Sequence, residues 1–506
     1  MNTATDQSRA RARAQLGMSA PVITVETHLP GGLPGFTLVG LPATAVREAR
    51  DRVKSAITNC GLDFPMGRVL VNLAPADLAK EGARLDLAIA VSVLSATGQV
   101  PFRNVDEFEY LGELSLGGSL RPVRGGLCAA LSLARQGSSR RLVAPHANSA
   151  EFTMAPANAV VPVSHLHDVV RLLRSGDSSP WPQPAQAGPA TPAASDMNHV
   201  VGQQAAKRAL AVAAAGGHHV LLIGPPGTGK TMLARSLGQL LPILSDAAAE
   251  ESAAVYSAAG MLAPPPYQPP FRDPHHSCTA PAMIGGGGPP QPGEISLAHR
   301  GVLFLDELPH FKPSVLNLLR EPLETQEINI ARAGYRARFP AGFQLVAAMN
   351  PCPAGNLCEP PRCRCTPDQV RRYQGRISGP LLDRIDLHVG VPPVPNHLLL
   401  TAPQPGETAG HWQQQVVLAR QQQMARQGKL NAELGPGELQ VAAELDPDSR
   451  SLLADASAKF HLSARGIHRV LKVARSIADL EPVERVTAQH VAQALSYRAI
   501  NWGEAG

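Results

Sequence analysis

A glycine-rich octapeptide between a short apolar run and a helical pattern constrains this chain more than any other feature. It reads Gly224-Pro225-Pro226-Gly227-Thr228-Gly229-Lys230-Thr231. Residues 220–223 before it predict a buried strand, and residues 232–237 after it predict a helix. A phosphate-binding loop needs this context, because inward N–H groups and a helix start attract phosphate. We therefore predict that Lys230 contacts the β- and γ-phosphates of ATP and that Thr231 binds Mg²⁺.

Two later apolar runs end in the polar residues that ATP hydrolysis requires. The run 301–305 ends in Asp306 and Glu307, and the run 343–349 ends in Asn350. Uninterrupted apolar runs are typical of central parallel strands. Asp306 is predicted to hold the Mg²⁺ shell, and Glu307 to orient and deprotonate the attacking water. Asn350 is placed to polarise the same water, so the pattern indicates hydrolysis and not binding alone.

Length and composition limit the number of domains, the kind of partner and the location that this chain can have. The chain has 506 residues, which predicts two or three domains, and a net charge of +5, which permits a nucleic-acid partner without demanding one. Aromatic residues make up only 4%, which argues against extensive base stacking. Since no apolar run reaches the roughly 18 residues of a membrane span and residues 9–13 do not open a signal peptide, we expect a cytoplasmic protein without a membrane partner.

The N-terminal third, residues 1–174, has the pattern of a mixed α/β domain. Alternating residues 22–27 and 36–39 predict a hairpin, and residues 44–60 predict an amphipathic helix. Residues 175–195 are rich in Pro, Ala and Ser without periodicity, which predicts a flexible linker.

A basic hairpin is predicted at residues 327–339, turning near Ala333-Gly334. Arg336 and Arg338 lie two residues apart and so share one face of a strand. With Arg332 they are candidate DNA contacts, because arginines bind phosphates. The alternative is a solvated edge hairpin whose charges deter aggregation.

Four cysteines crowd into the loop after Asn350, at positions 352, 358, 363 and 365. Thiolates of Cys352, Cys358, Cys363 and Cys365 would enclose a tetrahedral Zn²⁺. Their spacing is not that of a standard zinc ribbon, so four unligated thiols remain an equal alternative.

The N-terminal third resembles the proteolytic domain of Lon and the Lon-like domain of the RadA recombination proteins. The likeness rests on Lys80-Glu81-Gly82, on 112–116 and on Gly125-Gly126-Leu127. Lon proteases carry a Ser two residues after that first turn and a Lys after Gly-Gly-Leu, where this chain has Arg84 and Cys128. The resemblance implies a ribosomal S5 domain 2-like α/β fold without the protease dyad, serving as a scaffold or as a DNA-engaging module.

Residues 196–395 resemble the P-loop AAA+ core, a three-layer α/β/α fold, and residues 396–506 a C-terminal all-α lid. In related ATPases an arginine placed like Arg384 reaches the γ-phosphate of the neighbouring subunit, which implies a ring. Arg465 or Arg469 could be the lid arginine called sensor 2, and Arg465 fits the pattern of the MCM branch better. An ordinary surface arginine is the alternative for either residue. The Gly/Pro-rich segment 272–299, which includes His275-His276, resembles the insert of the magnesium-chelatase and MCM branch; we assign that histidine pair a phosphate or loop contact.

Over nearly its full length the chain resembles the ComM/YifB proteins, magnesium-chelatase-like AAA+ ATPases of bacteria. The likeness is carried by segments 40–42, 71–78, 274–276, 292–299, 348–353 and 381–386. It implies a homo-hexameric, ATP-driven DNA helicase that binds single-stranded and branched DNA. Its expected activity is branch migration in homologous recombination during natural transformation. The strand-exchange recombinase is a possible partner. Ala354 stands where the family commonly has a second cysteine, which puts a shared zinc site in doubt.

Two other classes of function stay open beside the DNA translocase. One is a motor that remodels a protein or inserts metal, as magnesium chelatase does; we rank it lower because those subunits lack the Lon-like domain. The other is an ATP-driven protease, which Arg84 and Cys128 contradict.

Overall fold

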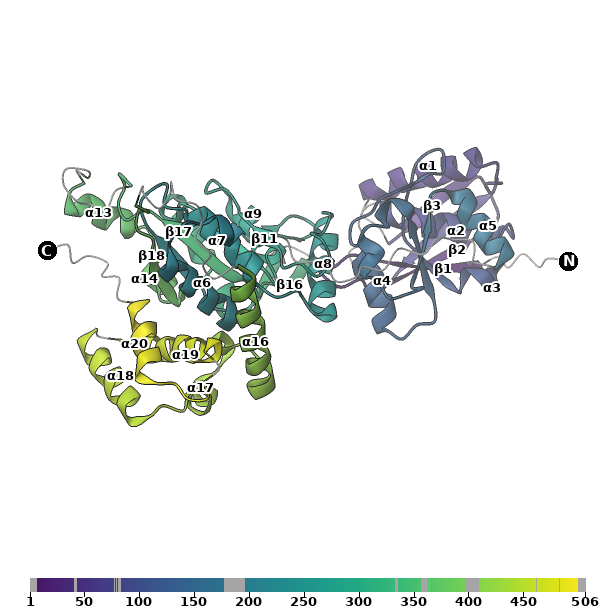
Figure 1. Cartoon of the computed structure of the whole chain (residues 1–506). Helices are drawn as coiled ribbons and strands as arrows, with labels where there is room; N and C mark the ends of the chain where they lie inside the picture. The colour runs from purple at the N-terminus through teal and green to yellow at the C-terminus, as the bar shows by residue number, and fades with distance from the viewer. Residues whose placement is uncertain are drawn as a thin grey trace.

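The protein folds into three units that lie side by side in Figure 1. The computed structural model describes residues 7–40, 43–76, 78, 80, 83–176, 196–332, 335–355, 363, 365–395, 409–460, 462–481 and 483–498. The N-terminal unit ends with α5 (Leu166–Ser175). Nearly all of the predicted linker, residues 177–195, lies outside the described residues.

A seven-stranded sheet forms the centre of the N-terminal unit, in the order β3-β4-β2-β1-β5-β8-β9. Its strands are β1 (Gln7–Arg13), β2 (Val22–His28), β3 (Gly35–Val39), β4 (Arg68–Ala74), β5 (Phe108–Tyr110), β8 (Arg141–Pro145) and β9 (Val160–Val163). The helices of this unit besides α5 are α1 (Ala43–Asn59), α2 (Asp86–Ala96), α3 (Phe102–Val105) and α4 (Gly126–Arg135). All residues of α2 are buried, because this helix packs against β1 and β2.

The predicted hairpin of residues 22–27 and 36–39 is wrong. β4 lies between β2 and β3, and β2 pairs instead with the preceding strand β1. That strand alternates Arg and small residues: Ala10 and Ala12 are buried, while Arg13 pairs with the buried Glu109 at 2.5 Å. Because its charges are neutralised by acids far along the chain, the sequence of β1 has no apolar pattern of its own.

The central unit is built on a parallel sheet of order β11-β14-β17-β10-β18. Its strands are β10 (Val220–Ile223), β11 (Phe271–Arg272), β14 (Val302–Leu305), β17 (Gln344–Met349) and β18 (Leu387–Gly390). Its main helices are α6 (Gln204–Gly216), α7 (Lys230–Leu240) and α8 (Asp246–Ala259). The prediction of a mixed α/β chain with a parallel sheet is confirmed, and this strand order fits an AAA+ core.

The N-terminal unit is attached to the central unit through α4 and α8, which lie next to each other where the two units meet (Figure 1). Gly125 N donates to Ser257 O at 2.8 Å, Leu127 N donates to Ser257 Oγ at 3.1 Å, and Cys128 Sγ donates to Ala254 O at 3.3 Å. Apolar residues of both units form one continuous core there. The two units are therefore packed together and not only joined by the chain between them.

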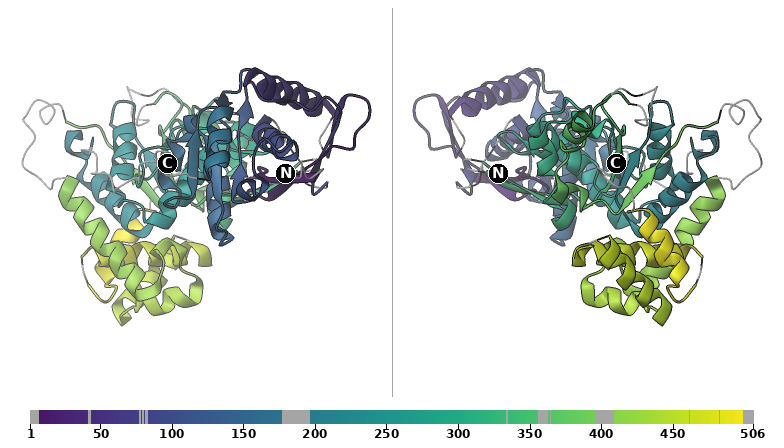
Figure 2. Two further views of the ribbon diagram at one scale, coloured as in Figure 1. Left: turned by 90° about the vertical axis from the view of Figure 1, so that its right-hand side faces the viewer. Right: turned by 90° about the vertical axis from the view of Figure 1, so that its left-hand side faces the viewer.

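The C-terminal helices lie below the central unit in all three views (Figures 1 and 2). They are α16 (Ala409–Gln427), α17 (Pro436–Ala443), α18 (Pro447–Lys459), α19 (Ala464–Leu480) and α20 (Ala488–Ser496). They contact the amino-terminal end of the sheet: Asp386, directly before β18, accepts from Arg469 at 3.4 Å, and His388 N donates to Tyr497 O at 2.7 Å. The junction between core and lid therefore combines these polar contacts with a shared, buried apolar core.

Acidic pH is expected to loosen this junction. Burial lowers the pKa of His388 and of His219 to about 4 each, whereas an unfolded histidine titrates near about 6.5. The unfolded chain therefore binds more protons between those pH values, and stability falls as the pH drops. A depressed pKa at Asp386, where the hydrogen bond of His218 and the charge of Arg469 outweigh desolvation, acts with the same sign.

We expect the buried His388 to account for roughly 2–3 kcal/mol of lost stability once the pH is below 4.5, and His219, beside an open cavity, for less. Urea unfolding at a series of pH values from 7 to 4.5 measures the slope. His388→Asn should flatten it, whereas the matched His146→Asn, on an exposed residue, should not. An equal slope in the chain and in His388→Asn would contradict this assignment.

Candidate nucleotide-binding site

The predicted phosphate-binding loop runs from the end of β10 into α7, as the sequence indicates. Gly229 caps α7 with a left-handed φ of 86°, a conformation that favours glycine. Lys230 Nζ donates to Gly224 O at 2.7 Å and to Pro225 O at 2.8 Å, so the side chain folds back over the loop. Burial lowers the pKa of Lys230, and the negative charges of Asp306 and Glu307 oppose that shift.

The polar ends of three adjacent strands meet at this loop. Thr231 Oγ1 donates to Asp306 Oδ2 at 2.9 Å, and Lys230 Nζ donates to Asn350 Oδ1 at 3.1 Å. Asp306 and Asn350 come directly after β14 and β17, which flank each other beside β10 in the parallel sheet. Carboxyl ends of parallel strands share one edge, and such an edge is where ligands bind in open α/β sheets.

Glu307 is held in a left-handed conformation with φ of 51° at the end of β14. Its Oε2 lies 3.5 Å from His276 Nδ1 and 3.9 Å from His310 Nδ1. His276 also contacts His275, with ring centroids 4.0 Å apart and the ring planes tilted by 34°. The sequence predicts a phosphate or loop contact for His275-His276, and nothing in it points to His310. The structure places His276 and His310 beside Glu307, the acid that the sequence predicts to activate water.

Neither Arg384 nor Arg465 lies at the phosphate-binding loop of its own chain. Arg384 precedes β18, at the opposite end of the parallel sheet from the loop, where it forms an ion pair with Glu324 at 2.5 Å. Arg465 is exposed in the first turn of α19, one turn before Arg469, whose partner Asp386 is at that same opposite end. Within one chain the structure therefore does not assemble the sensor 2 contact with the γ-phosphate.

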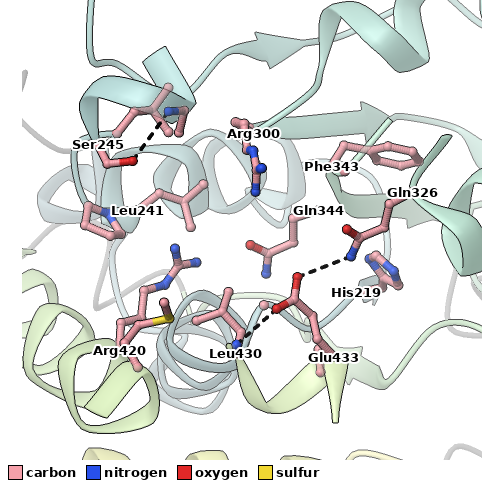
Figure 3. A pocket seen from close by; sticks show the side chains of 18 of the residues that line it. His219, Leu241, Ser245, Arg300, Gln326, Phe343, Gln344, Arg420, Leu430 and Glu433 are labelled. Atoms are coloured by element: carbon pink, nitrogen blue, oxygen red, sulfur yellow. Dashed lines mark hydrogen bonds between the residues drawn. The ribbon is translucent and has the colours of Figure 1, made fainter. Parts of the chain in front are cut away.

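A large cavity lies between the central unit and the C-terminal helices (Figure 3). Its volume is about 1550 Å³, and its lining includes Arg300, Gln344 and Arg420. Gln344 opens β17, so the cavity is at the amino-terminal edge of the sheet and is distinct from the phosphate-binding loop. Arg420 Nε donates to Ala214 O at 2.8 Å, which anchors α16 to the end of α6.

Three of the four predicted zinc ligands come together. The sulfur atoms of Cys352, Cys363 and Cys365 all lie within 4.8 Å of one another, and Cys352 Sγ is 3.5 Å from Cys363 Sγ. Cys358 lies outside the described residues. Three convergent thiols fit the chemistry of Zn²⁺, which prefers soft thiolate ligands.

The basic hairpin is formed by β15 (Glu327–Arg332) and β16 (Tyr335–Pro340), in antiparallel register. Arg336 and Arg338 are exposed, whereas the intervening Ala337 is buried in the core. Arg338 also forms an ion pair with Glu327 on the partner strand. The side chain of Arg332 is outside the described residues. The two described arginines thus present adjacent positive charges on the outer face of the hairpin.

A parallel sheet of this order, whose carboxyl edge unites a phosphate-binding loop with two acids and an amide, defines the P-loop AAA+ class. Three family models match the chain, and all carry magnesium-chelatase descriptions. Residues 25–148 match "Subunit ChlI of Mg-chelatase", residues 196–399 match "Magnesium chelatase, subunit ChlI", and residues 406–498 match the C-terminal part of that subunit.

Close relatives span almost the whole chain. An uncharacterized protein YifB of Escherichia coli is 46% identical, covering 98% of this chain and 97% of the relative. Competence protein ComM of Haemophilus influenzae is 45% identical, covering 97% of both chains. The magnesium-chelatase 38 kDa subunit of Cereibacter sphaeroides is 25% identical over 38% of this chain and 57% of its own length. The chain belongs to the ComM/YifB family of magnesium-chelatase-like AAA+ ATPases.

One expectation is affected by these matches. The match over residues 25–148 also has a chelatase description, so the N-terminal unit does not separate this chain from chelatase subunits. Among the residues that the structure describes, no helix is both long and apolar enough to cross a membrane.

Proposed function

We propose that the protein is an ATP-driven, homo-hexameric DNA translocase that promotes branch migration in homologous recombination during natural transformation. Membership of the magnesium-chelatase-like AAA+ family supports ATP hydrolysis. The name of its relative, competence protein ComM, supports a role in DNA uptake or recombination. The observation that carries the DNA assignment is the outer face of the hairpin, where Arg336 and Arg338 stand exposed beside each other.

The residues at the carboxyl edge of the sheet divide the work of hydrolysis. Lys230 neutralises the β- and γ-phosphates, Asn350 polarises the attacking water, and Glu307 takes its proton. Thr231 and Asp306 would hold Mg²⁺, because two hard oxygen ligands only 2.9 Å apart suit that ion. When bound, Mg²⁺ neutralises charge that develops on the phosphate oxygens.

The position of Arg384 supports a ring. This arginine lies at the opposite end of the sheet from its own phosphate-binding loop, so in our proposal it completes the site of the neighbouring subunit. The exposed Arg465 would act across a subunit contact in the same way. Each active site is then shared by two copies of the chain, and hydrolysis depends on assembly.

Four further assignments concern the N-terminal unit, the cysteine cluster, a protein partner and the location. We propose that the N-terminal unit is a Lon-like scaffold without protease activity; Arg84 and Cys128, at the dyad positions, are both buried. Cys352, Cys363 and Cys365 are proposed Zn²⁺ ligands, with Cys358 as the fourth. The strand-exchange recombinase is the expected partner, and the cytoplasm is the expected location.

A second candidate is a motor that remodels a protein or inserts a metal ion. Its support is that all three matched family models describe a magnesium-chelatase subunit. Stimulation of ATP hydrolysis by a porphyrin-binding or unfolded protein, and not by DNA, would favour it.

The test of the translocase is the double variant Arg336→Ala/Arg338→Ala. Removing two phosphate contacts should weaken DNA binding about tenfold or more and reduce the salt dependence by about two counterions. Stimulation of ATP hydrolysis by single-stranded or branched DNA should fall accordingly, with the hydrolysis seen without DNA unchanged. Fluorescence anisotropy over a range of salt concentrations and a coupled ATPase assay measure both effects.

The matched control is Arg121→Ala/Arg171→Ala. These arginines are equally exposed, lie on the N-terminal unit, and are ion-paired with Glu113 and Asp168 much as Arg338 is with Glu327. DNA stimulation that is the same in the hairpin variant and the control would refute the hairpin as the DNA contact. No stimulation of the parent chain by any DNA would refute the translocase.

A further inference from the structure

A group of metal-ligating side chains lies in the N-terminal unit, away from the nucleotide site. Cys60 directly follows α1, His165 caps the start of α5, and His167 is in the first turn of α5. One ligand atom of each lies within 4.8 Å of the other two. Ligands in a tetrahedral Zn²⁺ site, with bonds of about 2.0–2.3 Å, are separated by about 3.3–3.8 Å. The group is therefore within about 1 Å of a closed site.

The two imidazoles are oriented alike. Their rings are nearly parallel, with an interplanar angle of 12° and centroids 5.2 Å apart. The backbone fixes them: His167 N donates to His165 Nδ1 at 3.2 Å, and the Asp168 carboxylate accepts from His165 N at 3.1 Å. Because His165 Nδ1 accepts a hydrogen bond, the proton of a neutral ring is on Nε2. For a metal ion to bind the Nε2 lone pair of a neutral ring, that proton must move to Nδ1, and the hydrogen bond from His167 N must then break.

The glycine turn before β7 (Leu120–Arg121) completes the surroundings of this group. His165 Nε2 lies 2.9 Å from Gly117 O, and Cys60 Sγ points to the same oxygen at 3.9 Å. A Cβ on Gly118 would lie 2.4 Å from Cys60 Sγ and 3.0 Å from His165 Cε1. Only glycine lets the turn approach so closely, and the thiol and the imidazole consequently converge on one point.

We propose that Cys60, His165 and His167 bind one Zn²⁺ ion, with a water molecule as the fourth ligand on the exposed side of His167. Binding releases the thiol proton of Cys60, and His165 binds as a neutral ring through Nε2 with its proton on Nδ1. In the metal-free protein the thiol and Nε2 both point to Gly117 O. The buried Cys60 and the exposed His167 give the site one dry side and one open side. Mixed sulfur and nitrogen ligands suit Zn²⁺ better than Mg²⁺ or Ca²⁺.

Such an ion would join the end of α1 to the start of α5. Both helices contact the glycine turn: Asn59 Nδ2 donates to Leu116 O at 2.8 Å, and His165 Nε2 lies 2.9 Å from Gly117 O. Direct ligation would tie α1 and α5 into one rigid end of the N-terminal unit. The site does not depend on the proposed DNA function or on the cysteine cluster after Asn350.

Metal content of the full chain tests the proposal. Cys60→Ser and His167→Ala should each bind one equivalent of Zn²⁺ less than the parent, by elemental analysis after dialysis. Cys278→Ser, a change at a half-buried cysteine outside both groups, should bind as much as the parent. With Co²⁺ as probe, Cys60→Ser should lose one thiolate-to-metal charge-transfer band, and Cys352→Ser should retain it.

His167 is exposed, so His167→Ala keeps the test valid even if Cys60→Ser folds poorly. Parent-like Zn²⁺ content in both variants, or a Co²⁺ spectrum in Cys352→Ser without thiolate charge transfer, would overturn the site. Zn²⁺ should also raise the Tm of the parent more than that of His167→Ala.

Discussion

Glu307→Gln is expected to lower Mg²⁺-dependent ATP hydrolysis by a factor on the order of 10²–10⁴ and to leave ATP binding intact. The carboxylate follows β14 beside Asp306, and its Oε2 is within 3.5 Å of His276 Nδ1. Glutamine has the same shape but cannot take a proton from water. Steady-state phosphate release and the binding of a fluorescent ATP analogue separate the two effects.

The matched control is Glu321→Gln, the same chemical change at an exposed glutamate of the same unit. It should hydrolyse ATP like the parent. Lys230→Ala provides the opposite pattern, because loss of its charge at the phosphates should weaken nucleotide binding itself. A Glu307→Gln variant that retains more than about a tenth of the parental rate would show that another group activates the water.

The nucleotide site was largely predictable because its parts are local. Asp306 and Asn350 directly follow apolar strands, and the loop that leads to Lys230 follows a third. Parallel strands bring their carboxyl ends to one edge. Thr231 and Asp306 are therefore in contact, as are Lys230 and Asn350. The β15–β16 hairpin was equally local, since its two strands are separated by only two residues along the chain.

The contacts that sequence missed join residues far apart in the chain. His276 and His310 meet at Glu307 because the insert before β14 folds back over the strand end, and no spacing in the sequence records this. β1 was missed because its arginines are paired with Asp106 and Glu109, so its alternation of Arg and Ala resembles a basic tail. Likewise, the C-terminal helices were predicted from periodicity, which does not say against which end of the sheet they pack.

Asp479→Ala is expected to destabilise the C-terminal helices by about 3–5 kcal/mol, the cost of leaving buried charge unpaired. The carboxylate is 1% exposed and accepts from Arg426 at 2.7 and 3.0 Å and from Arg475 at 3.0 Å. It also accepts from Asn431 Nδ2 at 2.8 Å. One buried anion thus holds α16, α19 and the turn between α16 and α17 together.

Urea unfolding of the full chain, followed by circular dichroism and by the fluorescence of Trp412 on α16, measures the loss. Asp455→Ala removes an exposed carboxylate from α18 and should change stability by less than about 0.5 kcal/mol. Asp479→Asn should fall between the two, since it keeps acceptors for the guanidinium groups but not the charge. A loss below about 1 kcal/mol in Asp479→Ala would mean that water reaches Arg475 and replaces the carboxylate.

The same variant bears on the ATPase, because α19 carries both Asp479 and Arg469, the residue that contacts Asp386 before β18. If the C-terminal helices loosen, the contact of Arg469 with Asp386 weakens, and the turn that carries Arg384 is no longer held against α19. Arg384 is the arginine proposed to complete the neighbouring site, so Asp479→Ala should reduce hydrolysis in assembled rings. The binding of ATP to a single chain, which uses the opposite edge of the sheet, should persist.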